Sequence, residues 1–259
     1  MDKLLKEERQ QLILKVLQNR KRVTIKELSD RFNISAVTIR RDLQDLAQYG
    51  VVQRTHRGAI LATPTPPELP VIHRMTHTTA CKECIGRAAA ALVADGDSVF
   101  IGSGSTTIYV ARNLLERKNL TIITNALNIA TEMACAEGIT VVVTGGLLRA
   151  SELSLVGHIT ELSLHEVRVD KVIIGIPAIN LEAGLTNDYL PEVMTDRAIL
   201  RMSPELILVA DHTKFDKVAS AFVAPIDQVT TLVTDAGADP SYLSRLEALG
   251  VRLIIAKNL

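Results

Sequence analysis

Several short segments of the chain combine glycines, hydroxyls and charged groups in a way that suits an anionic ligand. The clearest runs from Gly102 to Thr107, reads GSGSTT, and directly precedes an expected helix at 108–115. Glycines let successive backbone N–H groups turn toward one point, and the hydroxyls add further donors. The dipole of the following helix also favours negative charge. This combination suits a phosphate or a carboxylate.

Three further segments have related chemistry. They are 124–126 (TNA), 144–146 (TGG, with Arg149 close behind) and 211–214 (DHTK). Each of the four segments follows an expected β-strand. One such loop alone is weak evidence, because Gly/Ser loops more often serve as ordinary turns. Several at equivalent strand ends favour a polar, phosphorylated ligand.

The elements that must position these segments are short β-branched runs alternating with helical stretches. The expected strands are 98–101, 120–123, 139–143, 171–174, 206–209, 231–233 and 251–255. Near-continuous apolar strands with helices between them predict an α/β domain whose sheet is mainly parallel and covered on both faces. Ligands of such sheets bind outside the carboxyl ends of the strands, which is where the polar segments fall.

A second kind of chemistry lies nearer the N-terminus. The segment from Thr24 to Tyr49 predicts two short helices separated by a break at 33–35. Thr24 and Glu27 can form a capping box, and Ser35 is a good N-cap for the second helix. The apolar stripes are Ile25, Leu28 and Phe32 in the first helix, and Val37 or Ile39, Leu43 and Leu46 in the second.

Basic residues of the second helix lie off most of that stripe. Arg40 and Arg41 are beside Thr38, on a helix expected to run from Ser35 to Tyr49 and to end at Gly50. A tight turn between two amphipathic helices, the second one basic, is the helix-turn-helix arrangement that reads a DNA major groove. An ordinary small helical domain, with the two arginines on a solvated face, is the alternative.

Flanking segments favour DNA binding. The expected helix at 9–17 supplies a packing partner, and 51–61 predicts a β-hairpin, which would be a wing beside the helix-turn-helix. Arg54, His56 and Arg57 would lie near phosphates. The predicted DNA contacts are therefore Ser35, Thr38, Arg40, Arg41, Arg54 and Arg57.

Charge is distributed unevenly between two expected domains. The chain balances at 29 basic and 29 acidic residues, but residues 1–62 contain 13 Lys and Arg against 7 Asp and Glu. Residues 1–62 therefore have a net charge of +6 and the remainder a net charge of −6. This asymmetry is expected when only one of two domains binds the phosphates of DNA. We expect a DNA-binding domain at 1–62, a proline-rich linker at 63–70 and a larger domain at 71–259.

Cysteine usage and hydropathy suggest a location. Three cysteines indicate a reducing cytoplasm rather than a disulfide framework, and neither a signal peptide nor a bilayer-spanning run is visible. His73, His77, Cys81 and Cys84 would share a face of a single helix. Four ligands along three turns of one straight helix cannot all reach one tetrahedral ion, so no metal is predicted. A partial site completed by another subunit and a redox-sensitive thiol pair stay open.

The order of these motifs resembles the DeoR family of bacterial sugar-responsive regulators, over nearly the whole chain. The head matches through TIRRDLQDL and HRGA. The body matches through GSGSTT, ITNALNIA, VTGGLLR, SLVG, DKVIIGI, GLTNDYLPEV, LVADHTKF and LVTD. The resemblance implies a sensor domain related in fold to ribose-5-phosphate isomerase and the CoA-transferase group, behind a winged helix-turn-helix. It also implies a repressor of a carbohydrate-catabolism operon that releases its operator, or changes its grip, when a sugar phosphate binds.

The resemblance also implies site residues and partners. Double-stranded operator DNA, a phosphorylated sugar and further copies of the chain, as a dimer or higher oligomer, are the expected partners, with no cofactor and no membrane. For Asp188, Glu192 and Lys214, surface polarity or a structural ion pair is the alternative. The implied effector-binding residues are Ser103, Gly104, Ser105, Thr106, Thr107, Asn125, Gly145, Gly146, Arg149, Asp188, Glu192 and Lys214.

Two departures from the family pattern concern the ligand. Many relatives have Asp where this chain has Gly102, and the usual Gly-Ala-Asp-Gly after the fourth strand is Gly-Ile-Pro-Ala at 175–178. Both suggest a ligand that differs from the commonest hexose or glycerol phosphates. An aldose–ketose isomerase using Asp211, Lys214 and Glu192 is the competing function. The attached DNA-binding head and the missing carboxylate at 102 weigh against it.

Overall fold

A computed structural model describes residues 6–48, 52–61, 69–75 and 79–257. The chain forms two compact units, 1–77 and 78–259. The second unit begins at 78, whereas the sequence suggested that the larger domain begins at 71. Most of the expected linker, 63–68, and also Tyr49, Gly50, Val51 and His77 lie outside the described residues.

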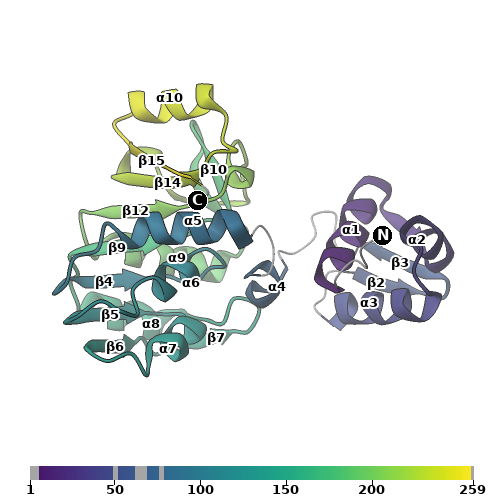
Figure 1. Cartoon of the computed structure of the whole chain (residues 1–259), viewed down its shortest axis with the longest axis horizontal. Helices are drawn as coiled ribbons and strands as arrows, with labels where there is room; N and C mark the ends of the chain where they lie inside the picture. Colours follow the sequence, from purple (N-terminus) through teal and green to yellow (C-terminus); the bar gives the residue numbers. More distant parts are fainter. Residues whose placement is uncertain (1–5, 49–51, 62–68, 76–78, 258–259) are drawn as a thin grey trace. The chain divides into compact units, whose positions relative to one another are not determined.

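Within the described residues, the N-terminal unit has four helices and a small three-stranded sheet (Figure 1). Its elements are α1 (Lys6–Arg20), β1 (Arg22–Thr24), α2 (Ile25–Phe32), α3 (Ala36–Gln48), β2 (Val52–Thr55), β3 (Gly58–Leu61) and α4 (Val71–Met75). The hairpin β2–β3 confirms the expected wing. The third strand β1 pairs antiparallel with β3 and was not predicted.

The helix ends in this unit follow the predicted capping. The Thr24 Oγ1 accepts from Glu27 N at 3.2 Å, and the Glu27 carboxylate accepts from Thr24 N at 2.8 Å. Hydrogen bonds from the backbone and hydroxyl of Thr24 lower the pKa of Glu27. The Ser35 Oγ accepts from Thr38 N at 3.2 Å at the start of α3. The capping box of Thr24 with Glu27 and the Ser35 cap both satisfy N–H groups that the first helical turn leaves without partners.

The core of the unit is formed by apolar side chains from α1, α2, α3 and the sheet. Of the two candidates for the α3 stripe, Ile39 is buried with Leu43 and Leu46, whereas Val37 is 57% exposed. The guanidinium of Arg9, on α1, donates to the buried carboxylate of Asp42 on α3. This buried, bidentate pair fixes α1 across α3 and orients the exposed face of α3.

The second unit is built on a seven-stranded parallel sheet, which confirms the expected α/β class. Its order is β15-β14-β12-β9-β4-β5-β6, and every neighbouring pair is parallel (Figure 1). The strands are β4 (Ser98–Ile101), β5 (Leu120–Thr124), β6 (Ile139–Val143), β9 (Lys171–Ile174), β12 (Leu206–Val209), β14 (Thr231–Asp235) and β15 (Arg252–Ala256). All seven lie where the sequence predicts strands.

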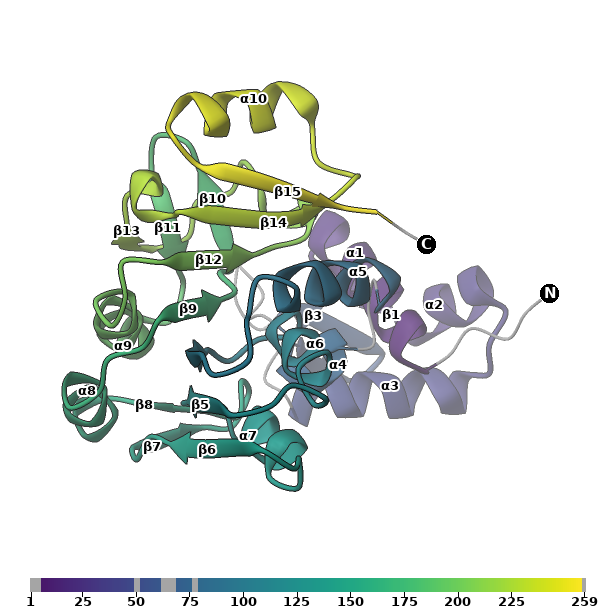
Figure 2. The same cartoon turned by 60° about the vertical axis from the view of Figure 1, so that its left-hand side comes forward.

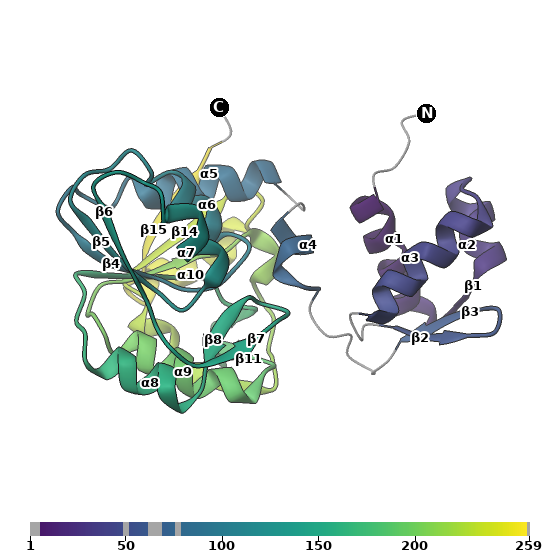
Figure 3. The ribbon, with the colours of Figure 1, turned by 90° about the horizontal axis from the view of Figure 1, so that it is seen from below.

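Helices cover both faces of this sheet. Figure 2 and Figure 3 show α5, α6 and α7 on one face and α8 and α9 on the other. The helices are α5 (Thr79–Ala90), α6 (Thr107–Arg112), α7 (Leu127–Met133), α8 (His158–His165), α9 (Leu190–Leu200) and α10 (Pro240–Ala248). Helix α10 packs against β15. None of the described helices combines the length and apolarity that crossing a bilayer requires.

Smaller antiparallel elements surround the carboxyl ends of the parallel strands and were not predicted. They are the hairpin β7 (Leu147–Arg149) with β8 (Ser154–Val156), and a sheet of β10 (Ala178–Asn180), β11 (Gly184–Asn187) and β13 (Ala221–Ala224). Two 3-10 turns, η1 (His212–Lys214) and η2 (Ile226–Gln228), follow β12 and β13. These additions supply most of the polar groups described below.

Candidate functional site

The exposed face of α3 is basic. Arg40 and Arg41 are both exposed, beside a helix start that Ser35 and Thr38 hold together by hydrogen bonds. The 57% exposed Val37 joins them and was not predicted as a surface residue. An exposed apolar side chain at the start of a groove-entering helix can contact a thymine methyl group. Charge and shape therefore fit a duplex DNA groove.

The wing turn adds basic groups to the same unit. Arg54, His56 and Arg57 are exposed. The Arg57 carbonyl accepts from Ile25 N at 2.9 Å, which ties the turn to the start of α2. A hollow between the wing turn, α2 and the start of α3 is lined by Arg40, His56 and Arg57 among others. The structure thus brings helix and wing residues together.

A glycine allows this arrangement. A Cβ at Gly58 would lie 1.9 Å from the Val23 carbonyl oxygen, where β3 crosses β1. Only glycine fits at so close an approach, so the position of the wing depends on Gly58.

In the second unit, the loop after β4 has the polar lining that the sequence predicts but a shorter helix behind it. Ser103 and Gly104 are half-buried, while Ser105, Thr106 and Thr107 are buried. The Thr107 Oγ1 donates to the Gly104 carbonyl at 3.1 Å. The expected helix at 108–115 is wrong in length, because α6 ends at Arg112. The donors that this segment offers are therefore its backbone N–H groups and hydroxyls, in front of a helix of only six residues.

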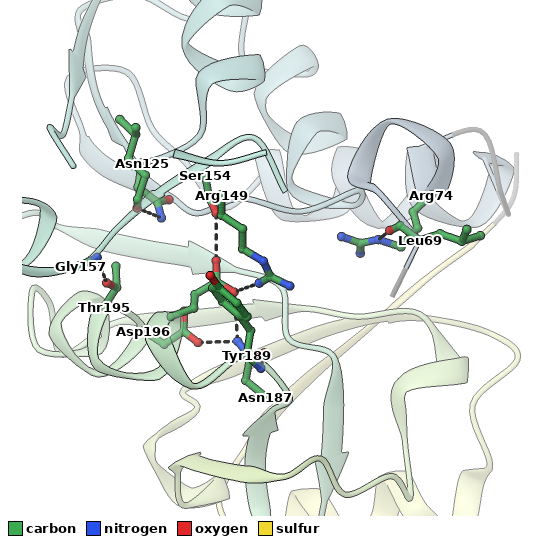
Figure 4. Close-up of polar contacts among 12 residues, drawn as sticks. Leu69, Arg74, Asn125, Arg149, Ser154, Gly157, Asn187, Tyr189, Thr195 and Asp196 are labelled. Atoms are coloured by element: carbon green, nitrogen blue, oxygen red, sulfur yellow. Dashed lines mark hydrogen bonds and ion pairs between the residues drawn. The ribbon is translucent and has the colours of Figure 1, made fainter. Parts of the chain in front are cut away.

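The strongest polar cluster centres on the buried Glu192, on α9. Its carboxylate forms an ion pair with Arg149 of β7 and accepts from Ser154 Oγ at 3.0 Å. It also accepts from Asn187 Nδ2 at 3.2 Å. Figure 4 shows Arg149 and Ser154 converging from one side and Asn187 from the other. The Arg149 guanidinium carbon also lies 4.2 Å from the centroid of the Tyr189 ring.

A second carboxylate lies beside this ion pair. The Asp196 Oδ2 accepts from Asn187 Nδ2 at 2.9 Å, so one amide bridges both acids. Burial, together with the neighbouring charge of Glu192, raises the pKa of Asp196 to about 8. One arginine facing two acids leaves one acid protonated at neutral pH. Asp196, Asn187, Ser154 and Tyr189 were not predicted, although Glu192 and Asp196 have the i, i+4 spacing of one helix face.

Asn125 lies at the end of β5, close to the β8 strand. It is buried, and its Nδ2 donates to the Leu155 carbonyl at 3.2 Å. Within the described residues its Oδ1 has no hydrogen-bond partner. The buried Thr144 Oγ1, just after the end of β6, also has no hydrogen-bond partner among the described residues. Buried polar atoms without partners are uncommon, and two at adjacent strand ends suggest that a ligand completes them.

The remaining predicted effector-binding residues differ in their exposure and in their contacts. Gly145 is exposed, and its carbonyl accepts from the Thr160 hydroxyl at 2.6 Å, whereas Gly146 is half-buried. Asp188 is exposed and accepts from the backbone and hydroxyl of Ser220. Lys214 is half-buried on η1. Asp188 therefore has a local structural contact, in line with the alternative considered for it.

A further cluster follows β12 and β14. The buried Asp235 accepts from His212 N and from the His212 ring, both at 2.7 Å. Although burial pushes the pKa of Asp235 up, these hydrogen bonds hold it below its usual value. Burial, together with the charges of Asp235 and Asp211, raises the pKa of the Cys81 thiol. This network fixes η1, which carries Lys214.

The structure gives a physical reason for the glycine at 102. A Cβ there would lie 2.9 Å from Cγ2 of Ile174 and 3.6 Å from the Phe100 ring. A carboxylate therefore has no room unless Ile174 moves. Ile176, in the apolar segment after β9, is buried in the core. This end of the site is more apolar than the family pattern implies.

The histidines and cysteines do not form one ligand face. His73 is on α4 and Cys81 and Cys84 are on α5, two separate helices, and His77 lies outside the described residues. In the part of the chain that is described, no group of three or more His, Cys, Asp or Glu side chains is arranged to hold a metal ion.

Comparison with known proteins places both units in one family. The model of the DeoR C-terminal sensor domain matches residues 77–236, and that of the DeoR-like helix-turn-helix domain matches residues 9–65. The chain belongs to the DeoR family. It is thus a DNA-binding transcriptional regulator rather than an enzyme, which confirms the function expected from its motifs.

Curated DeoR-family relatives match over nearly their whole length. The transcriptional repressor AccR of Agrobacterium fabrum is 32% identical, covering 96% of this chain and 97% of the relative. The glycerol-3-phosphate regulon repressor of Escherichia coli is 34% identical, covering 86% and 88%. The repressor GlcR of Bacillus subtilis is 31% identical, covering 97% of both chains.

Solved structures overlap with this DeoR-family chain in part. Ribose 5-phosphate isomerase A from Neisseria gonorrhoeae covers 52% of both chains at 16% identity and a TM-score of 0.38. The Pyrococcus horikoshii translation initiation factor eIF-2B covers 88% of this chain and 87% of its own, at 15% identity and a TM-score of 0.45.

Proposed function

We propose that this DeoR-family regulator is a repressor of a carbohydrate-catabolism operon and that a phosphorylated sugar, bound at the strand ends of the sensor domain, modulates its grip on operator DNA. The observation that carries the effector half is the polar cluster around Glu192. The names of curated relatives support repression, and one of them is named for glycerol 3-phosphate. We assign DNA binding to 1–62, a linker role to 63–70, and effector sensing and oligomerisation to 71–259.

The DNA contacts follow from exposure and charge. Arg40 and Arg41 reach base edges or phosphates from α3, with Thr38 and Ser35 near the backbone at the helix start. Arg54 and Arg57 hold flanking phosphates from the wing. A net charge of +6 on residues 1–62 makes affinity for DNA fall steeply with salt.

The effector half combines an anion cradle with groups suited to sugar hydroxyls. The loop 103–107 offers backbone and hydroxyl donors to a phosphate. Asn125, with an unused Oδ1, and Glu192, at the centre of the cluster, accept from hydroxyl groups. Gly145, Gly146, Arg149 and Lys214 complete the proposed contacts, and Asp188 supports the β11–α9 turn through Ser220. The apolar surroundings of Gly102 favour a sugar with fewer hydroxyl groups at that end.

We propose that the regulator acts as a homo-oligomer in the cytoplasm. Operators recognised by helix-turn-helix proteins carry paired half-sites, so two linked heads bind far more tightly than one. Three cysteines, none in a disulfide within the described residues, suit a reducing compartment.

A thermal-shift screen of the full-length protein tests the effector half. The panel contains phosphorylated sugars and polyols, each beside its unphosphorylated parent. A ligand present at one hundred times its dissociation constant adds about 2.7 kcal/mol of stability. We expect a shift that requires the phosphate. A shift of equal size with the unphosphorylated parent would disprove the role of loop 103–107, and no shift across the panel would exclude sugar phosphates as effectors.

A further inference from the structure

The first turn of α3 places an apolar side chain in the middle of a polar surface. Val37 is 57% exposed, whereas Ile39, Leu43 and Leu46 of the same helix are buried. Successive residues of an α-helix are about 100° apart around its axis, so Val37 points roughly away from the buried side of α3. Burial in the core of its own domain therefore does not account for Val37.

The side chains that share this outward face can read bases. Arg41 and Gln44 are exposed and lie four and seven residues after Val37, so the three form one stripe along the helix. In the major groove a guanidinium group can donate to guanine, a carboxamide can pair with adenine, and an apolar side chain can contact the methyl group of thymine. The stripe thus combines three kinds of direct base contact.

A neighbouring stripe of α3 faces a different part of the head. Ala36 and Arg40 line the hollow that Lys26 of α2 and Arg57 of the wing turn also line. Three of these four side chains are exposed cations, against one acid in the hollow, Asp30. The hollow therefore suits a phosphate of the DNA backbone, and a phosphate contact fixes how a helix lies in the groove. With Arg40 turned to the backbone, the stripe of Val37 is left for the bases.

We propose that Val37 is a specificity-determining residue, which packs against the C5-methyl group of a thymine in the major groove of the operator. Thymine alone among the four bases presents a methyl group there. The net charge of +6 on residues 1–62 requires an anionic occupant, and the match to the DeoR-like helix-turn-helix domain makes that occupant duplex DNA. This role goes beyond the proposed function, which assigns DNA binding to polar side chains.

The proposed contact has a defined size. Burying one methyl group contributes ~0.8 kcal/mol, which corresponds to about a fourfold change in the dissociation constant. Unlike the loss of a phosphate contact, the effect is confined to one base pair. Removing the methyl group of the base and shortening the side chain of Val37 should each weaken binding. The two losses should not add, because both remove the same contact.

The test uses the full-length protein and no effector. Duplexes that the protein binds are first selected from a random pool, and each thymine of the selected half-site is then replaced by uracil, one at a time. Gel-shift titrations compare the parent with Val37→Ala, a change that does not lower helix propensity. Ile72→Ala, at a residue of α4 that is 59% exposed, is the matched control.

We expect one uracil substitution to raise the dissociation constants of the parent and of Ile72→Ala about fourfold, and to leave that of Val37→Ala unchanged. If Val37→Ala were as sensitive as the parent at every thymine, Val37 would not be the methyl-reading residue. A selection that enriches no sequence, or a half-site in which no uracil substitution weakens the parent, would also overturn the proposal.

A second selection, carried out with Val37→Ala, separates base reading from a structural role. We expect the preference for thymine to relax at the uracil-sensitive position and to persist elsewhere in the half-site, with an unchanged melting temperature. A structural role would lower the affinity for all sequences and leave the selected sequence as it is. That result would contradict the proposal even if Val37→Ala bound DNA weakly.

Discussion

Arg149 and Glu192 stand 43 residues apart in the sequence and form an ion pair that joins the β7–β8 hairpin to α9. Their side chains are only 16% and 7% exposed, so neither charge is well solvated without the other. The pair therefore holds together two elements that the sheet itself does not connect. Any ligand that binds either side chain competes with this contact.

We predict that Arg149→Ala destabilises the protein by on the order of 3 kcal/mol, because it leaves a buried carboxylate without its cation. The double variant Arg149→Ala with Glu192→Gln should recover part of that loss, since the uncompensated charge is gone. Urea unfolding of the three proteins measures both effects. If the double variant lost more unfolding free energy than the two single variants together, the Arg149–Glu192 pair would not be the source of the destabilisation.

Asp196 gives the stability of the sensor domain a dependence on pH. Its pKa of about 8 in the folded protein lies above its ordinary value of 3.8. The stability that protonated Asp196 contributes to the folded state is therefore fully present below pH 3.8. It is lost as the pH rises through about 8. Asp196→Asn, which imitates the protonated acid, should flatten this fall, and Asp188→Asn, at an exposed acid, should not. Melting temperatures between pH 5 and pH 9 check the prediction.

Arg40→Ala should abolish specific operator binding and leave the melting temperature of the protein unchanged, because Arg40 is exposed. Gel-shift titration at several salt concentrations measures the loss, and the loss of one phosphate contact would also reduce the salt slope by about 1. Arg201→Ala, at an exposed arginine of the sensor domain, is the control. Normal operator binding by Arg40→Ala would mean that α3 is not the recognition helix.

Ser105→Ala and Lys214→Ala should bind operator normally yet respond weakly to the effector, since both residues belong to the proposed sugar-phosphate site and not to the head. The readout is the effector concentration that releases half of the bound operator, which we expect to rise at least tenfold. Ser244→Ala on α10 serves as the reference. Unchanged values for both variants would contradict the assignment of the pocket.

The sequence predicts the parallel sheet well and the antiparallel additions poorly. The run Leu206–Val209 is apolar throughout and buried along its whole length, which is typical of a strand covered on both faces, and the other six expected strands have similar β-branched runs. Strand β1 has only three residues, and its pairing with β3 depends on Gly58 rather than on any periodic pattern. Helix α6 ends at Arg112, and tight turns follow it, such as the one closed by Leu114 N and the Ala111 carbonyl at 3.0 Å. The apolar pattern of the sequence does not distinguish such turns from a continuing helix.

The sequence predicted some residues of the candidate site but not others. Resemblance placed Arg149 and Glu192 in one site, and the structure joins them directly. Tyr189, which stacks on Arg149, and Ser154, which donates to Glu192, come from segments with no periodic link to those partners. Asp188 matches the family motif but accepts hydrogen bonds from Ser220, because it lies at the bend after β11 rather than on the strand.

The close approach of Gly102 to Ile174 constrains how this regulator could acquire a different ligand. An Asp introduced at 102 alone would collide with the Ile174 side chain, and trimming Ile174 alone would leave a cavity beside Phe100. Either single step is disfavoured, whereas Gly102→Asp together with Ile174→Ala restores both volume and a hydroxyl acceptor. Divergence of ligand preference at this end of the pocket therefore requires compensated pairs of mutations, which makes it slower than change at an independent position.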